Sequence, residues 1–324
     1  MKVVILGAGV IGLSVAIRAI EEGHNVEIFA EKITPYTNSD RAGAYWSPFT
    51  NTTTSARIVK WGKESYRTFC KLIKVKNAGV SLVDGLEYFN SEDQFSESWC
   101  SYARNFRKIP RNELPKSFVA GFSYLVPVIL MEKYMRWLMK RFGSLGGKVT
   151  KKRVCDLSEI DSLSDIIVNC TGLGSIELFG DKLVTPIRGQ TVKVRVRSID
   201  LSTSKLYADP EFYIVPQSDG ILLGATAQKG DWNTNVNLKD TQYLIKKGGS
   251  IAPRIGNAPS IVNESVGLRP YRPQIRLEIE KRSKGEPPVV HNYGHGFNGV
   301  TFSWGCAKEV VEIIKNYFRF LDLK

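Results

Sequence analysis

Two glycine-rich turns, one near each end of the chain, contain the residues whose spacing suits the binding of a phosphate-bearing ligand. The first turn, residues 7–12 (GAGVIG), lies between an apolar run that ends at Leu6 and a helical pattern. Gly7 permits a tight turn, Gly9 allows the backbone to approach a pyrophosphate, and Gly12 allows the helix to pack closely on a strand. The free N–H groups at the start of that helix attract phosphate oxygens.

A carboxylate follows this turn at the separation that ribose recognition requires. A second apolar run, Val26 to Phe29, leads to Glu31, nineteen residues after Gly12. A carboxylate there can accept hydrogen bonds from both hydroxyls of an adenosine ribose, and it would repel a 2′-phosphate. The combination predicts a site for an adenine dinucleotide, either FAD or NAD. The plain alternative is a structural βαβ unit that binds nothing.

The second turn, residues 291–299 (HNYGHGFNG), follows a predicted strand and leads into a predicted helix. Its backbone N–H groups are suited to contact an electron-rich ring edge. His295 is a candidate acid or base within this turn. It lies between two glycines with no acidic neighbour in the sequence, which favours a structural role.

Three arginines precede the second turn and lie among prolines, which stiffen the backbone. They are Arg269, Arg272 and Arg276. A rigidly held arginine near a glycine-rich loop is suited to bidentate recognition of a carboxylate. Arg269 is the favoured candidate, and the alternative for each arginine is an ordinary surface position.

Composition indicates a globular protein with one large domain or two domains. The 324 residues are 43% hydrophobic and 24% charged, and no stretch approaches the roughly 20 apolar residues of a membrane span. The glycines of the first turn, together with Arg18, argue against a signal peptide.

Five cysteines without metal-ligand spacing indicate reduced thiols, and we expect no metal site. The net charge of +13 is scattered, which favours a solvated basic surface over nucleic-acid binding.

Hydrophobic periodicity predicts an α/β fold in which the nucleotide-binding unit is interrupted by a second region. Residues 54–75 and 307–320 have helical patterns, and a strand leading into a helix is expected over 127–142. A buried parallel-strand pattern at 165–172 returns the chain to the first unit. Alternating patterns at 190–196, 212–216 and 221–225 predict an antiparallel sheet. We expect one domain from residues 1–50, 145–182 and 265–324, and another, for substrate binding and as the expected interface, from 51–144 and 183–264.

Seven segments, in order along nearly the whole chain, resemble the FAD-dependent D-amino acid oxidase and D-aspartate oxidase family, nearest to the D-amino acid oxidases. The segments are GAGVIGLS (7–14), TPYTNSDRAGAYWSPF (34–49), VNCTG (168–172), RGQ (188–190), FYIVP (212–216), GLRPYRPQIRLE (267–278) and HNYGHGFNGVTFSWGCA (291–307). The resemblance implies a discontinuous Rossmann-like domain that binds FAD and an antiparallel-sheet α+β domain that binds the substrate.

The resemblance also implies a role for individual residues. Arg269 pairs with the substrate carboxylate, the Tyr213 hydroxyl helps to hold it, and the backbone carbonyl of Phe297 receives the amino group. A glycine or serine is commoner at the position of Phe297. The pocket-wall positions are Ser47, Phe49 and Val215. The positions that match FAD contacts are Gly7, Ala8, Gly9, Val10, Ile11, Glu31, Lys32, Ser39, Gly43, Ala44, Tyr45, Val154, Thr171, Gly296, Asn298, Gly299, Val300 and Thr301.

The implied activity is oxidative deamination of D-amino acids to 2-oxo acids, ammonia and hydrogen peroxide. It proceeds by hydride transfer from the α-carbon to flavin N5, with dioxygen as the final acceptor. The segment between Gln190 and Tyr213 is shorter than in mammalian members, so a truncated active-site lid is expected. Neither a membrane nor a nucleic-acid partner is expected. A homodimer is the assembly that the resemblance suggests. The expected compartment is the cytoplasm, or the peroxisome by resemblance, although the chain ends in LDLK and not in a Ser-Lys-Leu signal.

Three alternatives stay open. A D-aspartate oxidase is the runner-up within the family, although the arginine and histidine that those enzymes place near an acidic side chain are missing. A nicotinamide-dependent dehydrogenase would use the same N-terminal unit but would leave the second glycine-rich turn without a role. The remaining alternative is a basic binding module without catalytic activity.

Overall fold

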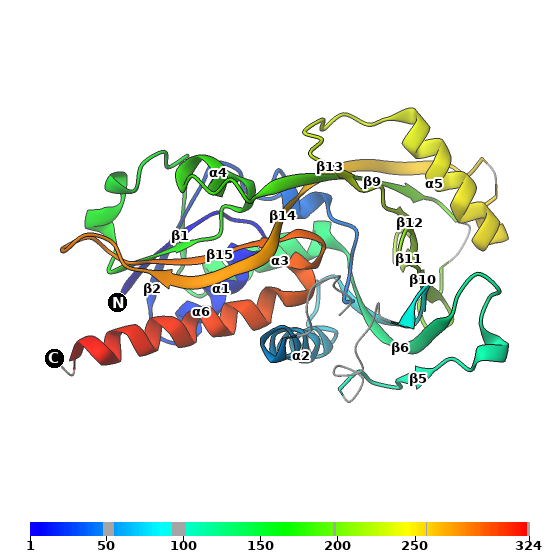
Figure 1. The fold of residues 1–324 in the computed structure, drawn as a ribbon, viewed down its shortest axis with the longest axis horizontal. Helices are drawn as coiled ribbons and strands as arrows, with labels where there is room; N and C mark the ends of the chain where they lie inside the picture. The colour runs from blue at the N-terminus through cyan, green and yellow to red at the C-terminus, as the bar shows by residue number, and fades with distance from the viewer. Residues whose placement is uncertain (48–54, 93–101, 197–198, 257, 323–324) are drawn as a thin grey trace.

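The computed structural model of the chain describes all residues outside 48–54, 93–101, 197–198, 257 and 323–324 (Figure 1). The first eight strands are β1 (Lys2–Leu6), β2 (Asn25–Ala30), β3 (Ala44–Tyr45), β4 (Val80–Phe89), β5 (Arg107–Lys108), β6 (Ala120–Ile129), β7 (Lys148–Lys151) and β8 (Ile166–Asn169). The other strands are β9 (Thr185–Val194), β10 (Lys205–Ala208), β11 (Tyr213–Gln217), β12 (Gly220–Gly224), β13 (Gln228–Lys229), β14 (Ile261–Glu280) and β15 (Val289–His295).

In the described part of the chain, six α-helices and several short 3-10 helices connect these strands. The α-helices are α1 (Val10–Glu21), α2 (Ala56–Leu72), α3 (Met131–Ser144), α4 (Ser175–Leu178), α5 (Leu238–Ile251) and α6 (Gly299–Asp322). The 3-10 helices are η1 (Asn38–Arg41), η4 (Arg111–Glu113), η5 (Leu157–Glu159), η6 (Asp161–Leu163), η7 (Gly172–Gly174), η8 (Pro253–Ile255) and η9 (Gly296–Asn298).

Five parallel strands form the part of the sheet that contains the N-terminus, in the order β15-β8-β1-β2-β7. Val3 and Ile5 of β1 pack into the helices on one face of the sheet. Val4 and Leu6 point the other way and pack into a second apolar cluster. A strand that is buried on both faces requires a continuous apolar run, which explains why β1 shows no polar alternation.

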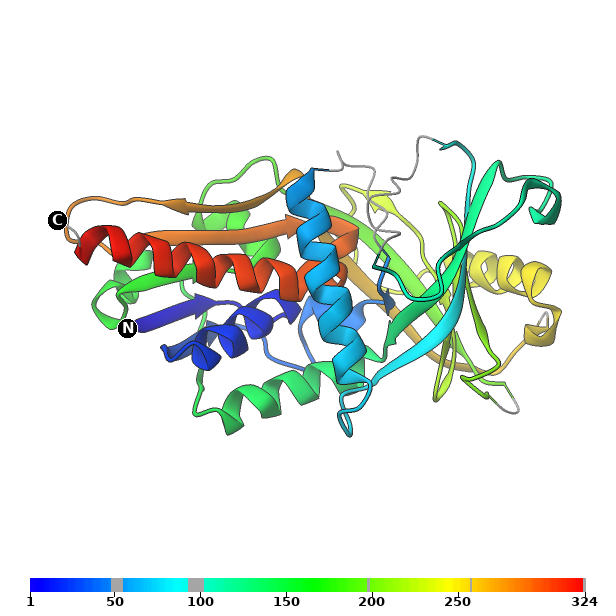
Figure 2. The same cartoon turned by 90° about the horizontal axis from the view of Figure 1, so that it is seen from below.

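Helices α1, α3 and α6 cover one face of these parallel strands, and α2 crosses the start of α6 (Figure 2). The backbone N–H of Gly305 in α6 donates a hydrogen bond to the Ser65 Oγ of α2 at 3.0 Å. A Cβ atom at Gly305 would overlap the backbone of Trp61. The two helices therefore approach backbone to backbone at this glycine, which fixes α6 relative to the sheet.

The other part of the sheet is mainly antiparallel. Strand β4 pairs with β6 over ten residues, and β12 pairs with both β11 and β9. Helix α5 covers β9 and β12 through an apolar cluster that includes Val192, Leu223 and Leu244. Only residues 209–212 connect β10 to β11, so the connection is short at the place where a truncated lid is expected.

Strand β14 joins the two parts of the sheet, as Figure 1 shows. Its residues 261–271 pair with β9, and its residues 276–280 pair with β15. The ladder to β15 is irregular between Tyr271 and Arg276, where Pro273 has no N–H to donate. Arg269 therefore lies on one continuous strand at the junction of the two parts.

The predicted α/β fold class is confirmed, and so are a helix within 54–75 and a buried parallel strand within 165–172. Three predicted boundaries are wrong. The strand expected from Pro127 begins at Ala120, the strand expected from Gln190 begins at Thr185, and the helix expected from Ala307 begins at Gly299. Residues 299–306 include Gly299, Thr301, Ser303 and Gly305, which have low helix propensity, but packing against α2 stabilises them as helix.

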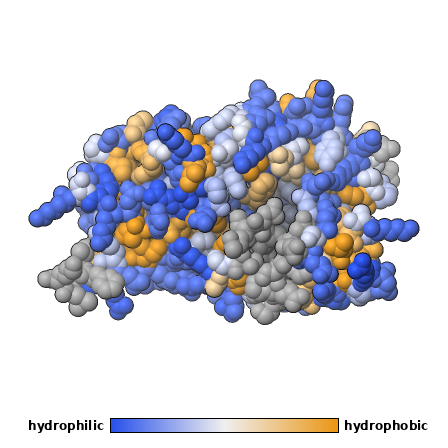
Figure 3. All heavy atoms as spheres, viewed as in Figure 1, coloured by the Kyte–Doolittle hydropathy of each residue, from blue (hydrophilic) through white to orange (hydrophobic). Residues whose placement is uncertain are grey.

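Polar and charged side chains dominate the face shown in Figure 3, and the apolar residues form separate patches. No helix in the described part of the chain is both long and apolar enough to cross a membrane. Among the described residues, no group of three or more His, Cys, Asp or Glu side chains is arranged to hold a metal ion. Cys70, Cys155, Cys170 and Cys306 are free thiols.

Gly305→Ala should destabilise the protein, because the added methyl group has no space between α6 and α2. Overpacking of this kind costs roughly 1–3 kcal/mol, so the thermal midpoint should fall by a few degrees. Gly143→Ala in α3 is the matched control, since its Cβ would enter open space. That change should stabilise by roughly 0.4–1 kcal/mol. Equal midpoints for the two variants would show that the helices do not touch at Gly305.

Candidate active site

A cavity of about 1340 Å³ lies at the carboxyl ends of the parallel strands, and both glycine-rich turns line it. The first turn follows β1, and the second begins at the end of β15. Segments that follow β2, β7 and β8 also line the cavity. In α/β sheets, ligands bind in the crevice outside the carboxyl ends of the strands, so this cavity is the expected place for a nucleotide.

The first turn has the backbone geometry that its glycines predict. Gly7 has a positive φ of 103°, and a Cβ there would lie 2.6 Å from the carbonyl oxygen of Cys170. A Cβ at Gly12 would overlap the carbonyl oxygen of Gly7. No acidic side chain lies in the first turn of α1, and its N-cap residue, Gly9, makes no side-chain capping bond. The N-terminus of α1 is therefore available to an anionic ligand.

Glu31 and Lys32 follow β2 and line the cavity as exposed side chains. Thr171 follows β8, and its backbone N–H and its hydroxyl both donate to Asn169 Oδ1, at 3.0 and 2.8 Å. Val154 lines the cavity beyond the end of β7. The predicted cofactor positions that follow these three strands thus lie together at one edge of the sheet.

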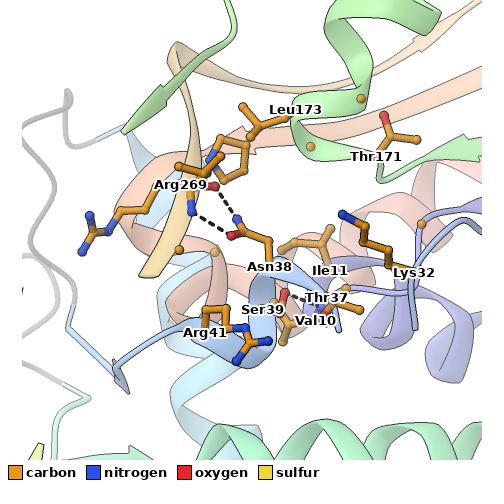
Figure 4. A pocket seen from close by; sticks show the side chains of 18 of the residues that line it. Val10, Ile11, Lys32, Thr37, Asn38, Ser39, Arg41, Thr171, Leu173 and Arg269 are labelled. Atoms are coloured by element: carbon orange, nitrogen blue, oxygen red, sulfur yellow. Dashed lines mark hydrogen bonds between the residues drawn. The ribbon is translucent and has the colours of Figure 1, made fainter. Parts of the chain in front are cut away.

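The 3-10 helix η1 brings Ser39 to the start of α1, where Ser39 Oγ accepts a hydrogen bond from the Val10 N–H at 3.0 Å (Figure 4). Asp40 stabilises η1 by accepting hydrogen bonds from the backbone N–H and the hydroxyl of Thr37. Asn38 binds both backbone groups of Leu268, accepting from its N–H at 2.8 Å. This contact connects η1 to β14 next to Arg269. Gly43, Ala44 and Tyr45 line the cavity immediately after η1.

Arg269 lines the cavity from β14, and no carboxylate lies within ion-pairing distance of it in the part of the chain that the structure describes. Its Nη1 donates to the carbonyl oxygen of Thr226 at 3.1 Å, and it also forms a hydrogen bond with Tyr213. Desolvation lowers the pKa of the guanidinium and the neighbouring Tyr213 raises it. An arginine nevertheless stays protonated in proteins, so the cavity contains a cation that has no anionic partner among the residues described.

Glycines provide the space for this arginine and its tyrosine. A Cβ at Gly189 would overlap the Arg269 guanidinium, and a Cβ at Gly43 or Gly224 would overlap the Tyr213 side chain. Burial raises the pKa of the Tyr213 phenol, although Arg269 opposes the shift, so Tyr213 is a neutral hydroxyl at neutral pH. Tyr213 contacts Arg269 but is not among the side chains that line the cavity.

The second glycine-rich turn places Gly296, Phe297, Gly299, Val300 and Thr301 on the cavity wall. The Phe297 ring is 56% exposed, and its centroid lies 4.8 Å from the Arg269 Cζ, which is a cation–π contact. Asn298 is in the same 3-10 turn, outside the cavity lining.

The surroundings of His295 distinguish an acid–base role from a structural role. His295 is buried, and burial lowers its pKa to about 3. Its Nε2 has no hydrogen-bond partner among the described residues. A ring with this pKa is neutral at physiological pH and is a poor proton acceptor, so the geometry favours the structural role.

The three pocket-wall positions have different surroundings. The Ser47 backbone N–H donates to Thr301 Oγ1 at 3.4 Å, so Ser47 lies beside the second turn. Val215 is fully buried in the main apolar core. Phe49 lies outside the described residues.

Arg188 has a positioning role that sequence reasoning did not assign, although the RGQ segment that contains it was matched. The side chain is only 2% exposed and forms an ion pair with Asp240 at 2.8 Å. It also donates to the carbonyl oxygens of Asn233 and Asn235 at 2.9 and 2.8 Å. These bonds hold a loop over the cavity, where Trp232, Thr234 and Val236 form part of the lining.

The residues present fit an adenine dinucleotide. The cavity exceeds the roughly 300–1,000 Å³ of an ordinary small-molecule site. It combines the N-terminus of α1, which has no acidic side chain in its first turn, for the pyrophosphate with a carboxylate after β2 for a ribose. Asn292, which lines the cavity, has both side-chain amide atoms buried without a hydrogen-bond partner in the described structure. A bound polar ligand would satisfy such groups.

Comparison with known proteins is consistent with this geometry. The model of the FAD dependent oxidoreductase family matches residues 2–313. A D-amino-acid oxidase of Dictyostelium discoideum is 36% identical over 322 residues, covering 97% of this chain and 91% of that protein. A human D-aspartate oxidase is 35% identical, covering 97% and 94%. A glycine oxidase from Geobacillus kaustophilus has the same fold, with a TM-score of 0.80, 17% identity and coverage of 97% and 95%. The chain therefore belongs to the FAD dependent oxidoreductase family.

Proposed function

We propose that this protein is a D-amino acid oxidase, which converts D-amino acids, dioxygen and water to 2-oxo acids, ammonia and hydrogen peroxide. The observation that carries the proposal is the guanidinium of Arg269, which lines a cavity suited to a dinucleotide and has no carboxylate partner in the described part of the chain. The D-amino-acid oxidases among the relatives support the same reaction.

The cofactor is FAD, which, when bound, supplies the acceptor for the two electrons of the substrate α-carbon–hydrogen bond. The proposed FAD-binding residues follow the ends of five parallel strands, β1, β2, β7, β8 and β15, or lie in and after the turn η1. They are Gly7, Ala8, Gly9, Val10, Ile11, Glu31, Lys32, Ser39, Gly43, Ala44, Tyr45, Val154, Thr171, Gly296, Asn298, Gly299, Val300 and Thr301.

Arg269 and Tyr213 are the proposed anchors of the substrate carboxylate. A guanidinium presents two parallel N–H groups to a carboxylate, and the neutral Tyr213 hydroxyl can donate a further hydrogen bond. Because Arg269 has no carboxylate partner within the described chain, the substrate would provide the missing negative charge. The Phe297 ring covers one side of the guanidinium and limits the access of water to this contact.

The amino group is proposed to bind the backbone carbonyl of Phe297, at the turn that precedes α6. Fixing both the carboxylate and the amino group leaves only one enantiomer with its α-hydrogen toward the flavin. Positioning of this kind can account for roughly 7–11 kcal/mol of the reaction barrier. His295 would not act as a base, because it is neutral and its pKa is about 3.

The domain boundaries, the wall of the substrate pocket, the compartment and the assembly are also proposals. Residues 1–50, 145–182 and 265–324 would form the FAD-binding domain, and residues 51–144 and 183–264 the substrate-binding domain. Ser47, Phe49 and Val215 would form the wall around the substrate side chain. The free thiols fit a reducing compartment, which we propose to be the cytoplasm or the peroxisome, and a homodimer is the proposed assembly.

A peroxide assay with D- and L-amino acids tests the reaction. The purified protein should show a flavin absorption band and release hydrogen peroxide from D-alanine in the presence of dioxygen. L-alanine should give no peroxide above background, because its α-hydrogen would point away from the flavin. Activity on D-aspartate alone would favour the runner-up, a D-aspartate oxidase. Peroxide from L-alanine at an equal rate would contradict the proposed substrate geometry.

Arg269→Ala should lower kcat/KM for D-alanine by roughly 30-fold to several thousand-fold, because truncating one partner of a desolvated charge pair costs roughly 2–5 kcal/mol. Arg269→Lys should lose less activity, since the charge remains but the two-pronged geometry is lost. Both variants should retain the flavin absorption band.

Arg107→Ala is the matched control for these arginine variants. Arg107 is an exposed arginine that pairs only with the exposed Glu113 among the residues described, so its removal should leave kcat/KM unchanged. An unchanged KM for D-alanine in Arg269→Ala would remove Arg269 from the site.

Glu31→Ala should weaken FAD binding, because the ribose would lose its carboxylate acceptor. Hydrogen bonds to charged groups contribute roughly 1.5–3 kcal/mol, which corresponds to a rise of roughly 10- to 150-fold in Kd. Titration of the apoprotein with FAD, followed by flavin fluorescence, measures this change. Glu22→Ala is the control, since Glu22 is exposed after α1 and pairs with Lys315. Equal Kd values in the two variants would show that Glu31 does not bind the ribose.

A further inference from the structure

A buried carboxyl group lies beside the proposed substrate pocket and has no part in the chemistry described above. Glu87, near the end of β4, is only 2% exposed. Its Oε1 accepts a hydrogen bond from the Tyr124 hydroxyl at 2.6 Å, and the Ser47 side chain also forms a hydrogen bond with the carboxyl group. Carboxylates are rarely this buried unless a cation accompanies them.

No lysine or arginine is recorded within ion-pairing distance of Glu87 in the described part of the chain. The segments 48–54 and 93–101, which lie outside the described residues, contain no lysine or arginine in their sequence. Burial raises the pKa of Glu87 to about 8, and the hydrogen bonds from Tyr124 and Ser47 oppose the shift. The carboxyl group is therefore largely protonated at neutral pH, and a cation beside it would favour its charged form.

Glu87 is connected to Arg269 through two tyrosines. Tyr213 forms a hydrogen bond with Arg269, and the ring of Tyr45 packs edge-on against Tyr213 with centroids 5.4 Å apart. Burial raises the pKa of the Tyr45 phenol, and the nearby Glu87 raises it further. Tyr45 is thus close both to Tyr213, which binds Arg269, and to the Glu87 carboxyl group.

Residue 46 continues the pairing of β3 with β6 beyond Tyr45, because the Trp46 N–H donates to the carbonyl oxygen of Pro127 at 2.8 Å. Side chains alternate along an extended segment, so those of Tyr45 and Ser47 point to the same side. The Trp46 side chain points to the other side, where its Nε1 donates to the carbonyl oxygen of Gly62 at 3.2 Å. Tyr45 lines the cavity and Ser47 binds Glu87, so both residues separate the cavity from the buried acid.

We propose that Glu87 makes the substrate pocket selective for D-amino acids with a cationic side chain, such as D-ornithine and D-lysine. This inference rests on the proposed D-amino acid oxidase function. With the carboxylate of the substrate held by Arg269 and Tyr213, a side chain that extends past Tyr45 brings its ammonium group to Glu87. Beside the ammonium group the acid would release its proton to solvent and form an ion pair, whereas an acidic side chain would bring a second group that is costly to bury in its charged form and no cation to pair with it. D-Aspartate is therefore expected to be a poor substrate.

A purely structural role is the competing explanation. Glu87 and Tyr124 lie diagonally on adjacent strands, since Glu87 pairs with Phe122 and Tyr124 pairs with Gly85. Their hydrogen bond could serve only to link β4 and β6. Glu87→Gln distinguishes the two roles, because the amide oxygen can still accept from Tyr124 while the negative charge is lost.

The test compares D-ornithine with D-norleucine, whose side chains have the same number of heavy atoms and differ by the terminal ammonium group. The wild-type protein should have the higher kcat/KM for D-ornithine. In Glu87→Gln this preference should fall at least tenfold, mainly through KM for D-ornithine, while kcat/KM for D-norleucine changes less than threefold. Tyr124→Phe, which keeps the carboxyl group, should retain the preference.

Each outcome decides the proposal. If the wild-type enzyme has equal kcat/KM values for D-norleucine and D-ornithine, the proposed selectivity is wrong and the oxidase function stays intact. This result does not depend on whether Glu87→Gln folds. An equal loss for both substrates in Glu87→Gln, or an unchanged ratio, would leave only the structural role. Failure to oxidise any D-amino acid while FAD is bound would instead contradict the proposed function itself.

Discussion

The desolvated guanidinium of Arg269 is the constraint on which the geometry of the site depends. A cation in such a position is unfavourable unless polar groups surround it and an anion completes the pair. The protein provides the carbonyl oxygen of Thr226, the hydroxyl of Tyr213 and the face of Phe297, but no carboxylate within the described residues. Gly189 leaves the space that the guanidinium occupies. The anion must therefore arrive with the ligand.

The fold places this guanidinium beside the nucleotide cavity through one shared strand. The first half of β14 pairs with β9 in the antiparallel part of the sheet, and its last residues pair with β15, which ends at the second glycine-rich turn. Asn38 connects β14 to η1, and η1 in turn contacts the start of α1 through Ser39. A chain of hydrogen bonds thus connects β14, beside the proposed carboxylate anchor Arg269, to the start of α1, the proposed pyrophosphate site.

The parts of the site that depend on local sequence could be predicted, and those that depend on strand pairing could not. The turn at 7–12 and Glu31 are separated by one βαβ unit, so their relative positions follow from standard geometry. The family resemblance predicts a shared role for Arg269 and Tyr213, and the structure places the two side chains in contact. Glu87 was missed because its proximity to Tyr45 follows from the pairing of β4 and of β3 with β6, which hydrophobic periodicity does not specify. The start of α6 was misplaced because contact with α2 outweighs the low propensity of its small residues.

A crystal structure of the FAD-bound protein with a non-oxidisable carboxylate, such as a 2-oxo acid, tests directly whether Arg269 binds the carboxylate of the substrate. The carboxylate oxygens should lie about 3 Å from the Arg269 guanidinium and the Tyr213 hydroxyl, over the ring of the flavin. Density for the carboxylate at any other place, with the Arg269 guanidinium still bound only to Thr226 and Tyr213, would show that this cation is structural and that the substrate binds elsewhere.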